Sequence, residues 1–490
     1  MRESGKNLTE AISEQRSKTC SLPIVVDLDG TLVLSDTLEE SVVLALFRRP
    51  AALMKTVPAL VRGRLAFKEA LAREVDLSEH SLPIRDELVS WLHEQAEKGH
   101  EIHICSAAHQ SIVEAFSRRI GFCTSAVGST STNLKGAAKA DYLRARFPEG
   151  FIYVGDHAAD LPVWEASEGI VLAGASAGVT GKAVALGKPV LKKFTAPRLT
   201  FREVFHALRV NHWTKNILVF VPLILAHQWS NLHIVWQTLC AFACLLAVTS
   251  GTYLLNDIAD INSDRQHWSK RHRAMASGRM PLRSGMLLAV FLILIGLAAA
   301  FVLSPAFFAT LLAYLALTSA YSLKLKSIPL LDTLVIGVLF TLRLVMGAVL
   351  LQTPKPAWLL TFGVFFFFSL ATAKRHTEIV RAGTKNTGSL KSRGYELEDG
   401  PLTLALGTSA AIASLVVIFI FIIMEMLPGN TYRHPEFLSG IPAMLSIWLG
   451  RIWLLSHRGL MNDDPVNFAV RDRTSLVLGA LVAILFVAAL

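Results

Sequence analysis

The stretch Asn256-Asp257-Ile258-Ala259-Asp260-Ile261-Asn262-Ser263-Asp264 lies where an apolar run of membrane-spanning length gives way to a basic loop. On a helix, Asp257, Asp260 and Asp264 stand at positions i, i+3 and i+7, so the three carboxylates share one face. Such clustered charge at the edge of a bilayer is costly unless metal ions neutralise it. Oxygen-rich clusters favour Mg²⁺, which usually completes its shell with substrate phosphates. The stretch therefore predicts Mg²⁺-dependent chemistry on a phosphorylated or pyrophosphorylated substrate at a membrane surface. A solvated loop with chance spacing is the structural alternative.

Apolar runs dominate the chain beyond residue 215, whereas the first 200 residues have the composition of a soluble protein. Nine runs have roughly the length that spans a bilayer, and they cover residues 216–232, 234–255, 285–303, 305–322, 329–351, 357–373, 402–427, 437–455 and 474–490. The first and last of these are the shortest. We therefore expect residues 216–490 to form an all-α polytopic membrane bundle of about nine transmembrane helices.

Basic residues mark alternate loops of this bundle. The loops after the second, fourth, sixth and eighth runs carry most of its lysines and arginines, whereas the opposite loops offer only Lys355 and Arg433. The positive-inside rule then places the basic loops and the aspartates in the cytoplasm of a multi-pass inner (plasma) membrane protein. Residues 1–20 lack the apolar core of a secretory signal, so we expect the first 200 residues in the cytoplasm as well. The net charge of +10 accompanies no RNA or DNA motif, and we expect no nucleic-acid partner.

The pattern Asn256-Asp257-x-x-Asp260-x-x-x-Asp264 resembles the first aspartate motif of the UbiA superfamily of membrane prenyltransferases. The resemblance covers roughly residues 205–490. It implies that the three aspartates hold Mg²⁺ on a pyrophosphate group, and that Asn256 orients a metal-bound carboxylate or a water.

Two further segments of the membrane half agree with this resemblance. They are Tyr321-Ser322-Leu323-Lys324-Leu325-Lys326, which precedes a helix beginning at Leu331-Asp332, and Ser277-Gly278-Arg279, which closes the basic loop.

One departure from the family pattern changes the expected substrates. Aromatic-acid prenyltransferases of the superfamily carry a second motif, DxxxD, where this chain has Lys374-Arg375-His376-Thr377-Glu378. Lysine and arginine contact phosphate directly rather than through Mg²⁺. Together with Asn211-His212-Trp213-Thr214-Lys215-Asn216, the pattern resembles the branch whose members transfer 5-phosphoribose from phosphoribosyl pyrophosphate (PRPP) to a polyprenyl phosphate. The resemblance implies that Lys374, Arg375 and Lys215 position two phosphate-bearing substrates. The alternative is that Lys374 and Arg375 are only positive-inside anchors.

Arg343 lies inside the fifth apolar run. An intramembrane arginine normally faces a cavity or a partner, which makes Arg343 a candidate ligand of the lipid phosphate. A structural pair with Asp332 or with a helix carbonyl is equally compatible with the sequence.

A second set of motifs lies in residues 20–195. The β-branched run Ile24-Val25-Val26 leads into Asp27-Leu28-Asp29-Gly30-Thr31, the apolar run 102–105 leads to Ser106, and the run 151–154 leads into Gly155-Asp156-His157-Ala158-Ala159-Asp160. Strands alternating with helical segments predict a doubly wound parallel sheet. Such sheets bind ligands at the carboxyl ends of their strands, where all of these polar residues would lie.

These motifs resemble those of the haloacid dehalogenase (HAD) superfamily and imply an α/β HAD-like Rossmannoid domain. By this resemblance, Asp27 is the nucleophile that forms an aspartyl-phosphate, and Asp29 is the general acid and base. Ser106 and Lys139 would hold the phosphoryl group, with Lys135 as the competitor for the role of Lys139.

The same resemblance implies a second Mg²⁺ site. Asp156 would join Asp27 in binding the metal, and Asp160 would support that shell or bind the metal directly. The alternative is a sheet that keeps these residues as capping groups without activity.

Two connecting segments complete the expected organisation. Residues 41–74 are apolar and basic and follow the first HAD motif, a position at which members of that family insert a cap over the active site. Their composition also suits a helix on an anionic membrane surface. Residues 196–215 are expected to form a basic linker or surface helix.

The leading interpretation is a bifunctional Mg²⁺-dependent membrane enzyme. Its bundle would transfer 5-phosphoribose from PRPP to polyprenyl phosphate, and its hydrolase domain would remove the 5-phosphate on the way to a lipid-linked pentose donor. One alternative is a conventional prenyltransferase that alkylates an aromatic acceptor from an isoprenoid diphosphate lipid. Another is a transporter or regulatory membrane protein whose hydrolase domain is the only enzyme.

Overall fold

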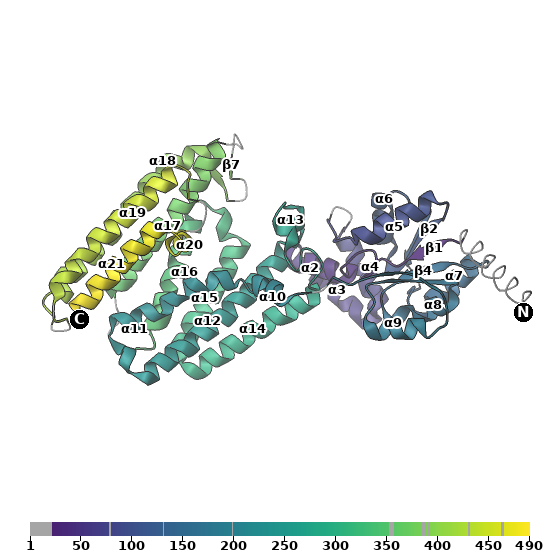
Figure 1. Cartoon of the computed structure of the whole chain (residues 1–490), viewed down its shortest axis with the longest axis horizontal. Helices are drawn as coiled ribbons and strands as arrows, with labels where there is room; N and C mark the ends of the chain where they lie inside the picture. The colour runs from purple at the N-terminus through teal and green to yellow at the C-terminus, as the bar shows by residue number, and fades with distance from the viewer. Residues whose placement is uncertain are drawn as a thin grey trace, which may run out of the picture. The chain divides into compact units, whose positions relative to one another are not determined.

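The computed structural model describes residues 22–77, 80–130, 132–197, 199–351, 357–384, 389–390, 393–429, 432–461 and 465–490. The chain divides into two compact units (Figure 1). The first contains Met1–Ala207 together with Leu254–Leu288, and the second contains Leu208–Tyr253 together with Ala289–Leu490. The stretch that carries the aspartate motif thus belongs to the same compact unit as the N-terminal part of the chain.

A six-stranded parallel sheet organises the first unit, in the order β3-β2-β1-β4-β5-β6. The strands are β1 (Ile24–Val26), β2 (Ile102–His109), β3 (Ser125–Ser129), β4 (Ile152–Gly155), β5 (Gly169–Ala173) and β6 (Val190–Phe194). The predicted doubly wound parallel sheet is confirmed. Its chain order reverses between β1 and β4, and the ends of these neighbouring strands are where such a sheet binds ligands.

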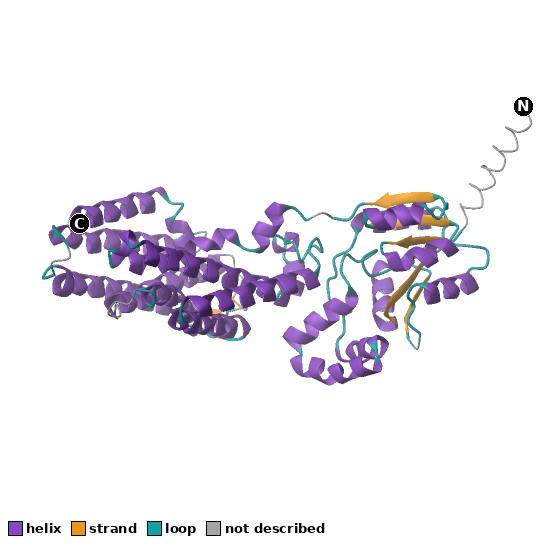
Figure 2. Cartoon of the chain, turned by 90° about the horizontal axis from the view of Figure 1, so that it is seen from below, coloured by secondary structure: helices purple, strands orange, loops and turns teal. Residues whose placement is uncertain are grey.

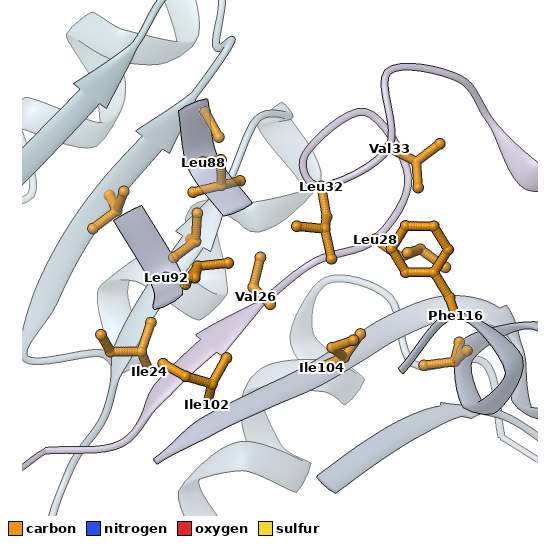
Figure 3. Close-up of a cluster of buried hydrophobic side chains, with 14 of the residues drawn as sticks. Ile24, Val26, Leu28, Leu32, Val33, Leu88, Leu92, Ile102, Ile104 and Phe116 are labelled. Carbon is orange, nitrogen blue, oxygen red and sulfur yellow. The ribbon is translucent and has the colours of Figure 1, made fainter. Parts of the chain in front are cut away.

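Alternation along β1 divides the core of this unit into two faces. Ile24 and Val26 pack with Leu88, Leu92 and other side chains of one cluster (Figure 3), whereas Val25 packs into a second cluster with Tyr153 and Trp164. Helices cover both faces, which is why β1, β4 and β5 are buried along their whole length. These helices are α5 (Asp86–Glu97), α6 (Gln110–Ile120), α7 (Ala137–Arg146), α8 (Leu161–Ala166) and α9 (Ala177–Val184).

The segment after β1 forms a small helical cap. Its elements are α2 (Thr37–Arg48), α3 (Pro50–Thr56), a 3₁₀ helix (Val57–Arg62) and α4 (Arg64–Glu74), which form a group of their own beside the sheet (Figure 2). Ala45, Phe67, Leu71 and Val75 build its core. The apolar side chains of Met54 and Val61 are 76% and 93% exposed. A membrane-surface role for this face stays a prediction.

Among the described residues, seven helices are long and apolar enough to cross a membrane. They comprise α12 (Leu232–Ala259), α14 (Leu282–Leu303), α15 (Pro305–Leu323), α16 (Leu331–Ala348), α17 (Ala357–Thr384), the segment Leu397–Met426 built on α18 (Gly400–Phe421), and the segment Pro435–His457 built on α19 (Ile441–His457). Helix α16 is the most buried of them. The polytopic helical architecture is confirmed.

Two of the nine expected runs account for the difference from the seven long helices of the described residues. The first predicted run is a 3₁₀ helix (Val210–Phe220) followed by α11 (Val221–Leu225), which ends before His227, a residue with a left-handed φ of 56°. The last is α21 (Arg473–Ala489), with 17 residues. Apolar composition predicts burial in lipid, but it does not distinguish a continuous α-helix from short turns.

Candidate active sites

The carboxylates expected to form the hydrolase site follow β1 and β4, which are neighbours in the sheet. Thr31 Oγ1 donates a hydrogen bond to Asp156 Oδ1 at 3.0 Å, which ties the loop after β1 to the loop after β4. Gly30 has a φ of +75°, and a Cβ at this position would lie 2.5 Å from Asp156 Oδ2. Only glycine meets both conditions, so the turn after Asp27 and Asp29 lies directly against Asp156.

Lys139 meets the proposed nucleophile at this edge of the sheet. Its Nζ lies 2.9 Å from Asp27 Oδ2 and donates to the Tyr153 hydroxyl at 2.9 Å, and its side chain is only 2% exposed. Burial alone would lower the pKa of Lys139, but the charges of Asp27 and Asp160 raise it. Lys135 is exposed. The geometry therefore favours Lys139 over Lys135 as the cation that holds a phosphoryl group beside Asp27.

Asp160 organises the loop that carries Asp156. Its Oδ2 accepts the backbone N–H groups of Asp156 at 3.1 Å and His157 at 3.0 Å, and its Oδ1 accepts the Tyr153 hydroxyl at 3.0 Å. Both carboxylate oxygens are thus engaged within the protein. Of the two roles expected for Asp160, this geometry suits the support of the metal shell rather than direct metal binding.

Asp29 connects the sheet to the cap. The N–H of Thr37, the first residue of α2, donates to Asp29 Oδ1 at 2.9 Å, and the Thr37 hydroxyl donates to Oδ2 at 3.3 Å. Burial raises the pKa of Asp29 to about 7, and the charges of Asp36 and Asp27 add to the shift. A carboxyl with this pKa can both give and accept a proton near neutral pH, as a general acid and base must.

Ser106 and Arg85 complete the surroundings of this site. Ser106 is fully buried in an irregular part of β2, and its Oγ accepts the N–H of Ala108 at 3.2 Å. Arg85, which the sequence interpretation missed, donates to the carbonyls of Thr31 at 3.0 Å and Gly30 at 3.1 Å. It therefore braces the turn that follows Asp27. A single arginine before a helix forms no motif, so no local signal marked it.

The chemistry of these carboxylates fits a divalent cation. Burial raises the pKa of Asp156 to about 7, with further contributions from the charges of Asp160 and Asp27. Buried carboxylates that repel one another are stabilised by a bound cation. The described residues contain no group of three or more His, Cys, Asp or Glu side chains placed to hold a metal. Mg²⁺ commonly takes one or two carboxylates and fills its shell with water and substrate phosphate, so Asp27 and Asp156 suffice.

The aspartate motif of the membrane half does not lie on one continuous helix, contrary to the expectation from its spacing. Helix α12 ends at Ala259, and Asp260, with φ −94° and ψ 9°, begins a separate short helix α13 (Ile261–Gln266). Asp257 and Asp264 are 7% and 1% exposed, whereas Asp260 is half-buried at the junction. Cationic side chains lie beside both buried carboxylates. Asn256 is half-buried on the last turn of α12, and its carbonyl accepts the N–H of Asp260 at 3.0 Å.

Arg273 joins two of these aspartates. Its Nη1 donates to Asp257 Oδ1 at 3.1 Å and also to Asp264 Oδ2. The other oxygen of Asp264 is buried without a hydrogen bond, and Lys270 Nζ lies 3.7 Å from it. Burial raises the pKa of Asp264, although Arg273 and Lys270 act against the shift. A buried carboxylate oxygen without a hydrogen bond fits a metal ion, so Asp264 suits the role that the motif implies.

The loop that follows, residues 260–281, is here called the aspartate loop. Arg265 forms a two-pronged ion pair with Glu40 of the cap, with Nη2–Oε1 and Nη1–Oε2 distances of 2.6 and 3.0 Å. Both side chains are 5% exposed. Ser81 gives its N–H to Asn262 Oδ1 at 3.2 Å and accepts Arg265 Nη1 at its carbonyl at 3.1 Å. Within the first unit, the aspartate loop is therefore anchored to the hydrolase cap.

The second unit contains a buried cationic centre built on Arg343 of α16, which is 6% exposed. Its Nε donates to Asn216 Oδ1 at 2.9 Å, its Nη1 to the Leu339 carbonyl at 2.6 Å, and its Nη2 to the Tyr314 hydroxyl at 2.9 Å. In the described part of the chain all its hydrogen-bond partners are neutral. Among the described residues, three of its five N–H donors have a hydrogen-bond acceptor, which leaves two for a ligand.

Aromatic rings and a second cation surround this guanidinium. Arg343 lies 4.9 Å from the centre of the Tyr314 ring and 5.1 Å from that of Phe340, and Lys215 Nζ lies 5.5 Å from the Phe340 ring. The structure therefore brings Lys215 and Arg343 to the same ring. A pair with a helix carbonyl is present, but the alternative pair of Arg343 with Asp332 is not.

Asp332 instead pairs with Arg375 of α17. Arg375 Nε lies 2.5 Å from Asp332 Oδ2, and Arg375 Nη1 also bonds to Glu378. The Tyr395 hydroxyl donates to Asp332 Oδ1 at 2.6 Å. Two carboxylates thus occupy much of the Arg375 fork, while its neighbour Lys374 is half-buried. Arg375 is therefore better placed to tie α17 to α16 than to contact a substrate phosphate.

Comparisons with known proteins agree with both sets of motifs. A model of the UbiA prenyltransferase family matches residues 217–468, and a model of the haloacid dehalogenase-like hydrolases matches residues 24–165. The uncharacterized protein y4nM of Sinorhizobium fredii is 42% identical over 470 residues, which are 96% of this chain and 91% of that protein. A match of this length includes both regions.

Two further relatives match a little more than half of the chain. The nodulation protein NoeC of Azorhizobium caulinodans is 33% identical over 58% of this chain and 91% of its own length. A decaprenyl-phosphate phosphoribosyltransferase of Mycobacterium tuberculosis is 29% identical over 55% of this chain and 88% of its own length. The chain therefore belongs to the UbiA prenyltransferase family as an integral membrane protein, and it carries a haloacid dehalogenase-like hydrolase domain on its N-terminal side.

Proposed function

We propose that the membrane bundle transfers 5-phosphoribose from PRPP to a polyprenyl phosphate, and that the hydrolase domain removes the 5-phosphate from the lipid product. The observation that carries the proposal is the cationic centre at Arg343. A conventional prenyltransferase binds one phosphate-bearing substrate, whereas this transfer requires two. The aspartate motif suits one of them, and a buried guanidinium with only neutral partners suits the second. The named activity of the mycobacterial relative supports this choice.

The residues of the transferase would divide the work as follows. Asp257, Asp260 and Asp264 would hold Mg²⁺, with Asn256 orienting one of the carboxylates or a water. The metal would supply charge neutralisation for the departing pyrophosphate. An oxygen of the lipid phosphate, already an anion, would attack the ribosyl C1 as it becomes oxocarbenium-like. No strong base is therefore required.

The basic residues would act by positioning. Arg343 and Lys215 would hold the lipid phosphate in the bundle, and Lys374 would contact a phosphate of either substrate. Arg375 would act mainly through its pairs with Asp332 and Glu378, which fix the part of α17 that carries Lys374.

The hydrolase would work through its own carboxylates. Asp27 would attack the 5-phosphate to form an aspartyl-phosphate, while Asp29 gives a proton to the leaving ribose oxygen and then takes one from the attacking water. Ser106 and Lys139 would hold the phosphoryl oxygens, and Asp27 with Asp156 would hold Mg²⁺. We propose that both sites face the cytoplasm at the inner membrane, the compartment that the positive-inside rule indicates.

A double-label assay tests the proposal. The full-length protein in detergent receives Mg²⁺, polyprenyl phosphate, and PRPP labelled with ¹⁴C in ribose and with ³²P in the 5-phosphate. We expect ¹⁴C to enter the lipid phase and ³²P to leave as inorganic phosphate. In Asp27→Asn the lipid should retain both labels, and in Asp257→Asn neither label should reach it.

Two outcomes would redirect the proposal. Absence of ¹⁴C transfer, together with prenylation of 4-hydroxybenzoate from an isoprenoid diphosphate, would establish the conventional alternative. Equal release of ³²P by the wild type and Asp27→Asn would remove the hydrolase from the sequence of reactions.

A further inference from the structure

Lys68 is a cationic side chain of the cap that the mechanism above does not use. It lies on α4, and its Nζ donates to the carbonyl of Ala107 at 2.8 Å. Ala107 follows Ser106, which is expected to hold the phosphoryl group. The same carbonyl also accepts the hydroxyl of Ser129 at 3.1 Å. The cap thus delivers an ammonium group to the edge of the sheet where the hydrolase site lies.

The charge of Lys68 is not neutralised by direct contact. In the part of the chain that the structure describes, its ammonium forms no ion pair, and the bond to Ala107 uses one of its three donors. Burial lowers the pKa of Lys68, and the charges of Asp29, Asp36 and Asp27 act against the shift. Lys139, by contrast, pairs directly with Asp27. Lys68 thus reaches the site from the cap, whereas Lys139 reaches it from α7 beside the sheet.

Asp29 is bonded to Thr37 of α2, and α2 shares the small core of the cap with α4, the helix that carries Lys68. Asp29 is the expected donor of a proton to the leaving alcohol, whereas Asp27 attacks phosphorus. A cation near Asp29 meets the part of the substrate that carries the alcohol. The half-buried ammonium of Lys68 has two further N–H donors, which suit an anionic oxygen on the alcohol part of the substrate.

We propose that Lys68 binds a second anionic group of the hydrolase substrate, so that the domain prefers phosphomonoesters that also carry a phosphate or phosphodiester over simple monoesters. This preference rests on the proposed activity of the hydrolase domain. It defines a substrate class for that domain, to which a ribose bearing a 5-phosphate and an anionic phosphodiester belongs.

Two substrates that differ only in the second anion test the proposal. Ribose 5-phosphate and ribose 1,5-bisphosphate, each labelled at the 5-phosphate, are given to the full-length protein with Mg²⁺. We expect kcat/KM to be about tenfold or more higher for the bisphosphate, as one charge-assisted hydrogen bond allows. Lys68→Met should raise KM for the bisphosphate and remove this ratio, with little change for the monophosphate. Lys68→Arg should retain the ratio.

Lys55→Met is the matched control, because Lys55 is an exposed lysine of the same cap. This variant should keep the wild-type ratio. An equal loss of kcat/KM for both substrates in Lys68→Met would overturn the proposal. It would mean that Lys68 either holds the phosphoryl group or only stabilises the position of the cap. An unchanged ratio would overturn it as well.

A binding measurement separates this proposal from the proposed activity. Calorimetry on Asp27→Asn, with and without Lys68→Met, compares the Kd of the two compounds without turnover. If the wild type hydrolyses neither compound, the proposed activity fails, but a tighter Kd for the bisphosphate that depends on Lys68 would still support the second-anion site. Equal Kd values for the two compounds would refute it.

Discussion

Asp29 owes its suitability as an acid to its surroundings. Its burial, together with Asp36 and Asp27, places its pKa at about 7, whereas the two bonds from Thr37 only moderate the shift. At neutral pH a substantial fraction of this carboxyl carries the proton that a leaving alkoxide needs. The cap helix α2 begins at Thr37, so the position of the acid depends on that of the cap.

A pH profile tests this assignment. With saturating Mg²⁺, which keeps Asp156 ionised, kcat for ribose 5-phosphate should fall as pH rises through about 7, because Asp29 loses its proton. Hydrolysis of p-nitrophenyl phosphate should show a weaker fall, because its leaving group needs no proton. Identical profiles for the two substrates would count against Asp29 as the acid.

Arg343 offers a second test at the scale of one residue. Arg343→Met removes a buried cation, and we expect KM for polyprenyl phosphate to rise about 10- to 100-fold, the range of one charge-assisted hydrogen bond. Arg343→Lys keeps the charge but loses the planar fork, so its KM for polyprenyl phosphate should lie between those of the wild type and of Arg343→Met. KM for PRPP should change little. A loss shared equally by both substrates would instead indicate damage to the bundle, which the thermal unfolding of each variant would reveal.

At the scale of elements, α2 and the aspartate loop are joined by the Glu40–Arg265 pair. Removing one partner of a buried ion pair costs about 3–5 kcal/mol, because the other charge is left uncompensated. Glu40→Arg and Arg265→Glu should each speed amide hydrogen exchange in residues 260–281. The double variant with exchanged charges should restore much of the protection. If the double variant loses as much protection as the two single variants lose together, the two side chains do not pair.

Gly278 fixes the same loop through its backbone. It has a φ of +73°, and a Cβ would lie 2.6 Å from Leu34 Cβ. Gly278→Ala should therefore destabilise the loop by more than the roughly 1 kcal/mol of a left-handed alanine alone. Gly121→Ala is the matched control, because Gly121 has a φ of +82° with nothing within 4 Å of its Cβ. Equal thermal shifts in the two variants would mean that Leu34 moves aside.

At the scale of the whole molecule, the carboxylates after β1 and β4 make stability depend on pH and Mg²⁺. Burial raises the pKa values of Asp29 and Asp156 to about 7 in the folded protein, above the ordinary value of 3.8 for an aspartate. Their contribution to stability is complete below pH 3.8 and is lost as pH rises toward 7. Mg²⁺ bound to ionised Asp156 offsets part of the loss.

The expected measurement is a melting temperature of the full-length protein in detergent, with and without Mg²⁺. The increase caused by Mg²⁺ should grow between about pH 4 and pH 7 and should shrink in Asp156→Asn. An increase independent of pH and of Asp156 would place the responsible metal elsewhere.

Much of the fold was accessible from the sequence, because its signals are local. Short β-branched runs followed by carboxylates predicted the strands of the parallel sheet, and long apolar runs predicted a helical membrane bundle. Local composition did not reveal that the run before residue 232 forms short turns, or that α12 ends at Ala259. Both depend on backbone conformation and tertiary packing rather than on hydrophobicity.

In the candidate sites too, residues in local motifs could be predicted from the sequence and residues defined by tertiary contacts could not. Asp27 and Lys139 belong to local motifs, and the structure brings them within 2.9 Å. Arg273 and Lys68 belong to none. Arg265 and Glu40 pair although they are 225 positions apart, a separation at which a sequence alone gives no sign of contact. Residues that brace a site are hard to predict because only the folded chain defines their neighbours.

The Glu40–Arg265 pair has a consequence for anyone who dissects the chain. A protein trimmed to residues 208–490 would keep Arg265 and the three aspartates but lose Glu40 and Ser81, the groups that receive its guanidinium. In such a fragment the guanidinium of Arg265 would lack the carboxylate that neutralises it. Trimming therefore needs a compensating change at position 265, and an inactive fragment would say little about whether the transferase can work alone.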